Sequence, residues 1–165
     1  MLRAHEWTWE DATHVDELRE VVPDVVVNAY TEPWVNWLRA EARGAFDEIH
    51  MYEFLEHTGH QGDYPEWFLF WEQVWHALKP GGMVFATAPY GLSRGAMGDP
   101  GHTRFLVEDS FWFLDPCQYK FNEMKRTTMT QYLIGFHLCN KVVLAAPTKK
   151  DGPVEHLFVV LEAKK

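Results

Sequence analysis

The stretch from residue 46 to residue 88 constrains the fold most, because it predicts a strand, a helix and a second strand in direct succession. Residues 64–78 place apolar side chains at steps of three and four, the spacing of a broad helical face. The sequence KPGG at 79–82 then predicts a helix end, since proline cannot continue a helix and glycine permits a positive φ angle. The apolar runs 46–52 and 83–88 predict buried strands. A strand, helix and strand in this order form a βαβ unit, whose strands are parallel.

The N-terminal part predicts further elements of the same kind. Residues 24–29 (DVVVNA) form a β-branched run that predicts a buried strand, and residues 13–16 predict a weaker strand before it. Residues 33–43 place apolar side chains near helical spacing, and Gly44 follows as a stop signal. These elements predict that the sheet continues on the N-terminal side of the βαβ unit.

The C-terminal part predicts a different arrangement. Residues 90–104 form a long glycine-containing loop, and loops of this length in compact domains tend to be functional. Residues 107–114 predict a short helix. The apolar runs 132–146 and 154–163 predict an antiparallel hairpin at the edge of the sheet. We therefore expect one α/β domain over residues 1–165, with a doubly wound, mostly parallel sheet and a C-terminal antiparallel hairpin.

The composition narrows the classes of function and the cellular location that can be expected for this chain. A formal charge of -9 disfavours binding to a nucleic-acid backbone, which requires Lys and Arg to neutralise phosphates. No segment predicts a signal peptide or a membrane span. Cys117 and Cys139 lie far apart and form no CxxC motif, so reduced thiols and a cytoplasmic location are expected. Trp67, Trp71 and Trp75 repeat at helical spacing, which predicts a core face or the face of a homodimer.

Polar residues follow several of the predicted strands. In a doubly wound sheet, ligands bind beyond the carboxyl ends of the parallel strands. Asp16 stands at such an end, where a carboxylate suits the hydroxyls of a ribose. Asn28 stands at another, where its amide suits the polar edge of an adenine, although an asparagine here can equally cap a turn. The segment from Tyr52 to His57 and the segment TAPY at 87–90 complete this edge.

Three motifs in combination resemble a known family. Residues 46–57 read FDEIHMYEFLEH, residues 78–82 read LKPGG, and residues 99–104 read DPGHTR. Together they resemble class I S-adenosylmethionine-dependent methyltransferases, in particular the small methyltransferase-like proteins of bacteriophages and their hosts. The similarity extends from about residue 13 to the C-terminus. It implies a Rossmann-like fold, S-adenosylmethionine as the cofactor, and methyl transfer to an acceptor that the sequence does not identify.

The resemblance also implies roles for individual residues. Asp16 matches the acidic residue that binds the cofactor ribose, and Asn28 matches a position near the adenine. Tyr52 and Glu53 match the strand end beside the methionine moiety. The two histidines on the acceptor side are His57 and His102, and either is a candidate to accept a proton from the acceptor, with Glu56 as a candidate to orient His57.

One departure from the family pattern opens an alternative function. Such proteins begin with a strand and a glycine-rich GxG turn that approaches the cofactor closely, but the corresponding segment here is about residues 4–6 (AHE), and no glycine precedes Gly44. The fold is therefore expected to be abbreviated at its N-terminus. A non-catalytic methyltransferase-like domain that acts in binding or assembly is the alternative to an enzyme.

The sequence contains two further candidate binding features. His57, His60 and Asp63 have a spacing that resembles a metal site, but they fall in a glycine-containing loop and no HExxH or CxxC motif accompanies them, so no metal site is expected. Arg104 is a candidate partner for an acidic acceptor, or else a member of an ordinary surface ion pair.

Overall fold

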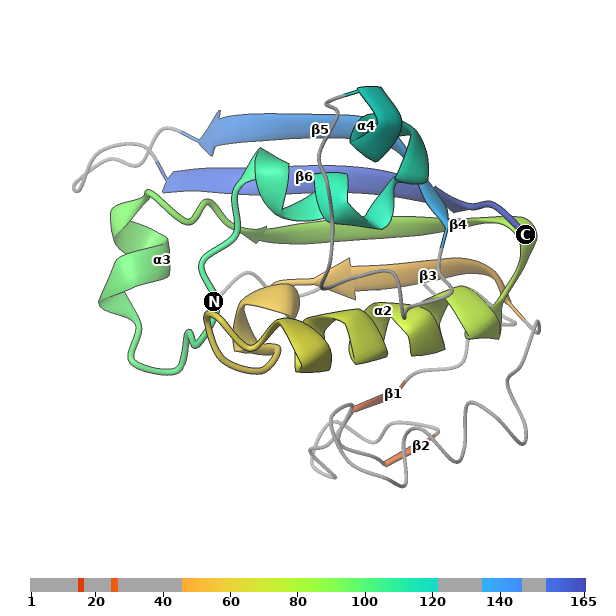
Figure 1. The fold of residues 1–165 in the computed structure, drawn as a ribbon. Helices are drawn as coiled ribbons and strands as arrows, with labels where there is room; N and C mark the ends of the chain where they lie inside the picture. Colours follow the sequence, from red (N-terminus) through yellow and green to blue (C-terminus); the bar gives the residue numbers. More distant parts are fainter. Residues whose placement is uncertain (1–14, 17–24, 27–45, 122–134, 147–153) are drawn as a thin grey trace.

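A four-stranded mixed sheet forms the centre of the protein (Figure 1). The computed structural model describes residues 15–16, 25–26, 46–121, 135–146 and 154–165. In these residues the sheet has the order β3-β4-β6-β5, in which β3 (Phe46–Tyr52) and β4 (Leu78–Pro89) are parallel. Strand β6 (Val154–Ala163) is antiparallel to both β4 and β5 (Phe136–Ala146). The predicted parallel pair and the predicted C-terminal hairpin are both confirmed.

Helix α2 (Tyr64–Ala77) connects the two parallel strands and begins with a well-formed cap. The carboxylate of Asp63 accepts a hydrogen bond from the backbone N–H of Glu66 at 3.1 Å, and a proline follows in the first turn, where its missing N–H costs nothing. The buried side of α2 carries Trp67, Phe68, Phe70, Trp71 and Val74. The helix therefore forms where the apolar spacing predicted it, within one residue of the expected end.

The segment KPGG at 79–82 lies within β4, whereas the sequence predicted a turn that separates helix from strand. Phe46 pairs with Leu78, but Glu48 pairs with Met83, so the register of the parallel pair shifts across this segment. Gly81, at φ 78°, adopts the left-handed conformation that this bulge requires. Strand β4 therefore begins directly after α2, at Leu78 rather than at Met83.

The core lies between the sheet and two helical segments on the same face (Figure 1). Trp71 of α2 is fully buried and makes edge contacts with Phe111 and Phe136, at centroid distances of 6.0 and 5.6 Å. Phe111 belongs to the 3-10 helix η3 (Glu108–Leu114), which coincides with the predicted short helix. Of the tryptophan stripe, Trp67 and Trp71 are buried in this core. The sequence left open that the tryptophan stripe forms a homodimer interface. Because Trp67 and Trp71 are buried within the chain, a homodimer would use a different face of the molecule.

Short elements complete the described part of the chain. They are η2 (Leu55–His57), α3 (Arg94–Gly98) and α4 (Pro116–Phe121), and neither α3 nor α4 was predicted. Strands β1 (Val15–Asp16) and β2 (Val25–Val26) form a separate parallel pair, which agrees with the two predicted N-terminal strands over these residues. The predicted helix at 33–43 lies outside the described residues. None of the described helices is long and apolar enough to cross a membrane.

Candidate functional site

The carboxyl ends of β3 and β4 lie side by side, and β6 begins at the same edge. Tyr52 pairs with Thr87 across the parallel strands, and Pro89 pairs with His156 across the antiparallel ones. Glu53, the residue directly after β3, has a φ angle of 51°. This left-handed conformation is uncommon for a residue with a side chain, and such conformations cluster at functional sites. The edge that the sequence predicted as the ligand site therefore contains a strained acidic residue.

Polar contacts fix the Glu53 carboxylate in place. Its Oε1 accepts a hydrogen bond from Thr87 Oγ1 at 2.9 Å and lies 3.2 Å from Nδ1 of His156, while its backbone N–H donates to the Thr87 carbonyl at 3.0 Å. The side chain remains 43% exposed, so the carboxylate is held but still open to a ligand.

His156 is a member of this site that the sequence analysis missed. It stands near the start of an antiparallel strand, whereas the rule for ligand sites in doubly wound sheets points only to the ends of parallel strands. An antiparallel strand beside a parallel one starts at the edge where its neighbour ends. Polar residues at the start of the last strand were therefore the signal that could have found it.

Tyr52 lies apart from this group of contacts. Its side chain is 58% exposed, and its hydroxyl is 2.7 Å from Nδ1 of His50, whose Nε2 is 2.9 Å from a carboxylate oxygen of Glu48. Partial desolvation and the charge of Glu48 raise the pKa of Tyr52. The hydroxyl thus belongs to a row of polar side chains along one face of β3, next to the strand end.

Glu56, His57 and His102 come together, with ligand-type atoms all within 4.8 Å of one another. The two imidazole rings are 5.0 Å apart in an edge-on arrangement. Each donates its Nδ1 proton to a backbone carbonyl, His57 to Gly101 at 2.9 Å and His102 to Ala96 at 3.0 Å. A carbonyl oxygen only accepts, so these bonds leave Nε2 of each ring without a proton in the neutral form.

Glu56 is the buried member of this cluster. Its side chain is 2% exposed, and within the described part of the chain Oε2 has no hydrogen-bond partner. Burial is the main cause that raises the pKa of this carboxyl group, and the nearby Glu53 carboxylate adds to the effect. Glu56 Oε1 lies 3.9 Å from Nε2 of His57, which is longer than a hydrogen bond. The Gly101 carbonyl, instead of the predicted Glu56, is therefore the group that orients His57.

Arg104 attaches the loop that carries His102 to the loop that follows His57. Its guanidinium donates to the carbonyls of Thr58, His60 and Asp63 at 2.7, 3.0 and 3.1 Å, and it lies 4.6 Å from the ring centroid of Trp67. The side chain is buried, which contradicts the surface position that an ordinary surface ion pair implied, whereas a contact to an acidic acceptor stays a prediction. Because its hydrogen bonds connect these two loops, Arg104 has a structural role.

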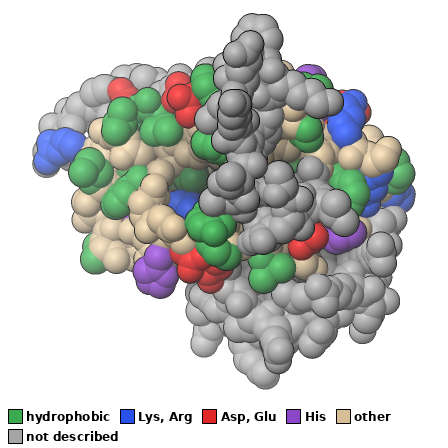
Figure 2. Space-filling model, in the orientation of Figure 1, with side chains coloured by type: hydrophobic (Ala, Val, Ile, Leu, Met, Phe, Trp, Pro, Cys, Tyr) green, Lys and Arg blue, Asp and Glu red, His purple; other side chains and the backbone are tan. Residues whose placement is uncertain are grey.

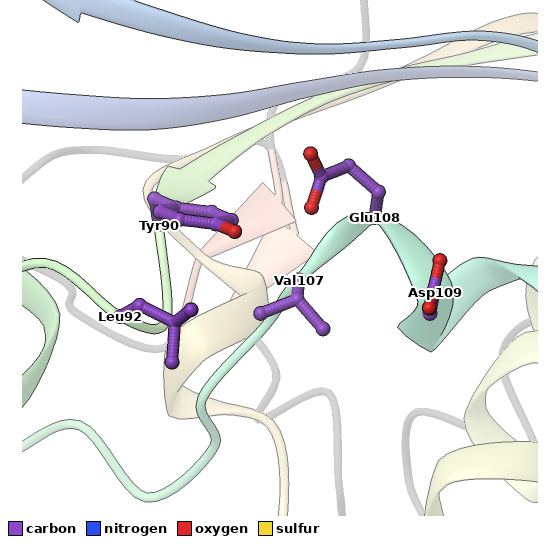
Figure 3. Close-up of a pocket in the computed structure, with 5 residues that line it drawn as sticks. All are labelled: Tyr90, Leu92, Val107, Glu108 and Asp109. Atoms are coloured by element: carbon purple, nitrogen blue, oxygen red, sulfur yellow. The ribbon is translucent and has the colours of Figure 1, made fainter.

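A cavity of about 390 Å³ opens where β4 ends (Figure 3). It is lined by Tyr90, Leu92, Val107, Glu108 and Asp109. The Tyr90 hydroxyl points toward the Glu108 carboxylate, and partial desolvation together with this carboxylate raises the pKa of Tyr90. On the face shown in Figure 2, the Lys and Arg side chains of the described residues are scattered among acidic and apolar ones.

Tyr90 begins the loop on one side of this cavity, and the backbone is tightly packed there. The N–H of Gly91 donates to the Leu106 carbonyl at 2.7 Å, and a Cβ atom on Gly91 would lie 2.8 Å from backbone atoms of Leu106. Only glycine permits this close approach. Of the predicted edge segment TAPY at 87–90, Tyr90 therefore lines a cavity and Thr87 contacts Glu53.

The remaining predicted residues are placed as follows. Asp16 ends β1 and pairs with Val26, and its side chain lies outside the described part of the chain. Asn28 lies outside the described residues altogether. His60 and Asp63 take part through their backbone carbonyls, which Arg104 binds, and neither belongs to the cluster of Glu56, His57 and His102.

Comparisons with known proteins bear on the fold. No protein-family model matches the sequence, and no curated protein matches it. Among solved structures, a SAM-dependent methyltransferase from Archaeoglobus fulgidus matches with a TM-score of 0.52 and 11% identity, over 90% of this chain and 74% of that one. A SAM-dependent methyltransferase from Methanosarcina mazei matches with a TM-score of 0.49 and 16% identity, over 84% of this chain. This chain spans only 65% of the M. mazei protein.

The mixed sheet with its parallel βαβ unit, together with the Archaeoglobus match, fits an α/β Rossmann-like fold. The predicted α/β class and Rossmann-like architecture are thereby confirmed. The chain has a class I SAM-dependent methyltransferase-like fold.

Proposed function

We propose that the protein transfers a methyl group from S-adenosylmethionine to an acceptor at the carboxyl edge of β3 and β4. The observation that carries the proposal is Glu53, whose carboxylate is held by Thr87 and His156 in a strained backbone conformation at this edge. Ligands of doubly wound sheets bind at such an edge. The solved methyltransferase from Archaeoglobus fulgidus supports the proposal at the level of the fold.

The cofactor contacts follow from the positions of the acidic residues. Glu53 binds the methionine moiety, whose ammonium group a carboxylate attracts, and neighbouring Tyr52 lies beside it. Asp16, which ends β1, binds the ribose hydroxyls, and Asn28 contacts the adenine. A cofactor held in this way presents its sulfonium toward the loops that follow β3 and β4.

The reaction itself is an in-line displacement. A nucleophilic atom of the acceptor forms a bond to the methyl carbon while the bond from this carbon to sulfur breaks, and the electron pair stays on sulfur as the sulfonium becomes a thioether. The protein mainly has to align the two reactants and exclude water. The acceptor's proton passes to Nε2 of His57 or His102, which the Nδ1 bonds to Gly101 and Ala96 leave free to accept it.

The cavity beside Tyr90 is the proposed place of the acceptor. It opens at the end of β4, in the loop region that also carries His102. Its two carboxylates, Glu108 and Asp109, favour an acceptor with hydroxyl or amino groups that donate hydrogen bonds.

Calorimetric titration with S-adenosylhomocysteine, performed in the presence of EDTA, tests the cofactor site. We expect one saturable site, and we expect Glu53→Gln to weaken binding by about tenfold to a hundredfold, because the substitution removes a charge-assisted hydrogen bond. Asp47→Asn is the matched control, since Asp47 is an exposed residue at the start of the same strand, at the end opposite to Glu53. Its affinity should equal that of the wild type.

Two results would count against the proposal. Absence of heat at millimolar ligand would favour the non-catalytic binding or assembly domain. Equal affinities of the wild type and the Glu53→Gln variant would place the cofactor elsewhere.

A further inference from the structure

We infer that Glu56, His57 and His102 form a binding site for a divalent transition-metal ion such as Zn²⁺ or Co²⁺. Two imidazole nitrogens and one carboxylate oxygen are a donor set that such ions prefer. The ligand-type atoms of the three side chains already lie within 4.8 Å of one another, although His57, at the end of η2, and His102 are 45 positions apart in the sequence. From the sequence, only His57, His60 and Asp63 were candidates for a metal site, and none was expected there because they fall in a glycine-containing loop without a metal-binding motif.

The hydrogen bonds around the two histidines match those of metal ligands. A metal-binding histidine usually donates its second ring N–H to a carbonyl or a carboxylate, which fixes the tautomer and the ring orientation. His57 and His102 make this bond to the carbonyls of Gly101 and Ala96. Both rings therefore keep a lone pair on Nε2, the atom that would bind the ion.

Glu56 supplies an independent observation. Its side chain is 2% exposed, yet Oε2 has no hydrogen-bond partner among the residues that the structure describes. A buried polar atom without a partner costs free energy, so native structures rarely contain one unless an ion, a water molecule or a ligand completes it. A cation beside the two imidazoles would complete this carboxylate.

The surrounding loops hold the three ligands in place. The carbonyl oxygen of Glu56 accepts from the backbone N–H groups of both Thr103 and Arg104 at 3.0 Å, so the residue after His102 is bonded directly to the residue before His57. The buried guanidinium of Arg104 connects the same two loops. The site is therefore rigid before any ion binds, which reduces the entropy cost of binding.

Metal binding at this site does not require methyl transfer, but it would change the role of the two histidines in that reaction. An ion at this position would bind the Nε2 atoms that are proposed above to take up the proton. The ion would then promote loss of that proton in another way, because it would lower the pKa of a hydroxyl group of the methyl acceptor bound to it. Two imidazoles and one carboxylate leave coordination positions open for such a group.

Titration of the metal-free full chain with Co²⁺ and Zn²⁺, without cofactor, tests the inference. The protein is treated with EDTA and dialysed, and binding is followed by calorimetry and by the visible absorption of Co²⁺. We expect one ion per chain. Glu56→Gln, His57→Ala and His102→Ala should each weaken binding more than about tenfold, since even the loss of a residue that only supports a ligand costs 10- to 100-fold in metal affinity.

His60→Ala is the matched control, because His60 lies in the same loop but outside the cluster. Its affinity should remain that of the wild type. His57 is 47% exposed, so His57→Ala is expected to fold even if the Glu56 variant does not, and circular dichroism of each variant checks this. Metal binding that is absent, or that falls equally in the His60 variant, would overturn the inference. Because the cofactor titration contains EDTA and the metal titration contains no cofactor, failure of one leaves the other intact.

Discussion

The guanidinium of Arg104 connects the loop that follows His57 with the segment that carries His102. It donates to three backbone carbonyls in the loop after His57 and stacks on Trp67. The guanidinium of an arginine spreads five N–H donors over a planar fork, whereas the ammonium of a lysine places three donors on a single atom and cannot span carbonyls that lie apart. The geometry of His57 and His102 therefore depends on a residue that contacts neither ring in the described hydrogen bonds.

Arg104→Lys should lower the free energy of unfolding by about 2 to 3 kcal/mol, because buried carbonyls lose charged donors. Urea-induced unfolding followed by circular dichroism measures this change. Arg94→Lys, at the exposed start of α3, is the control and should change the stability by less than about 0.5 kcal/mol. Similar values for both variants would show that Arg104 does not hold the loops together.

At the scale of the element, α2 forms where its apolar spacing predicted it and contributes several large side chains to the core. Trp71 is fully buried among Trp67, Phe70, Phe111 and Phe136. Periodicity was sufficient to predict the helix, because a face of this breadth has to be buried. The start of β4 was less predictable, since Gly81 and its neighbours are compatible both with a turn and with the bulge that the structure contains.

Trp71→Ala should cost about 3 to 5 kcal/mol, as expected for the loss of a large aromatic side chain from a packed core. Thermal and urea unfolding measure it. The matched control is Leu69→Ala, because Leu69 belongs to the same helix and is 42% exposed. The account of the core would be contradicted if the Leu69 variant lost as much stability as the Trp71 variant.

For the whole molecule, the sequence predicted the topology better than the site. Parallel strands, a connecting helix and a final hairpin each have a local pattern, and all three were confirmed. Contacts between loops have no such pattern. The cluster of Glu56, His57 and His102 depends on hydrogen bonds across 44 positions, and the Glu53 contact to His156 spans 103. Family resemblance predicted roles for His57, His102 and Glu53, but the hydrogen-bond partners of these residues follow only from the folded chain.

The central claim is that the edge formed by the ends of β3 and β4 binds the adenosine-containing methyl donor. A crystal structure of the chain with S-adenosylhomocysteine tests it most directly. The account predicts ligand density at this edge, with the amino acid moiety of the ligand within hydrogen-bond distance of the Glu53 carboxylate. Density at a different edge of the sheet, or a saturated crystal with none at Glu53, would contradict it.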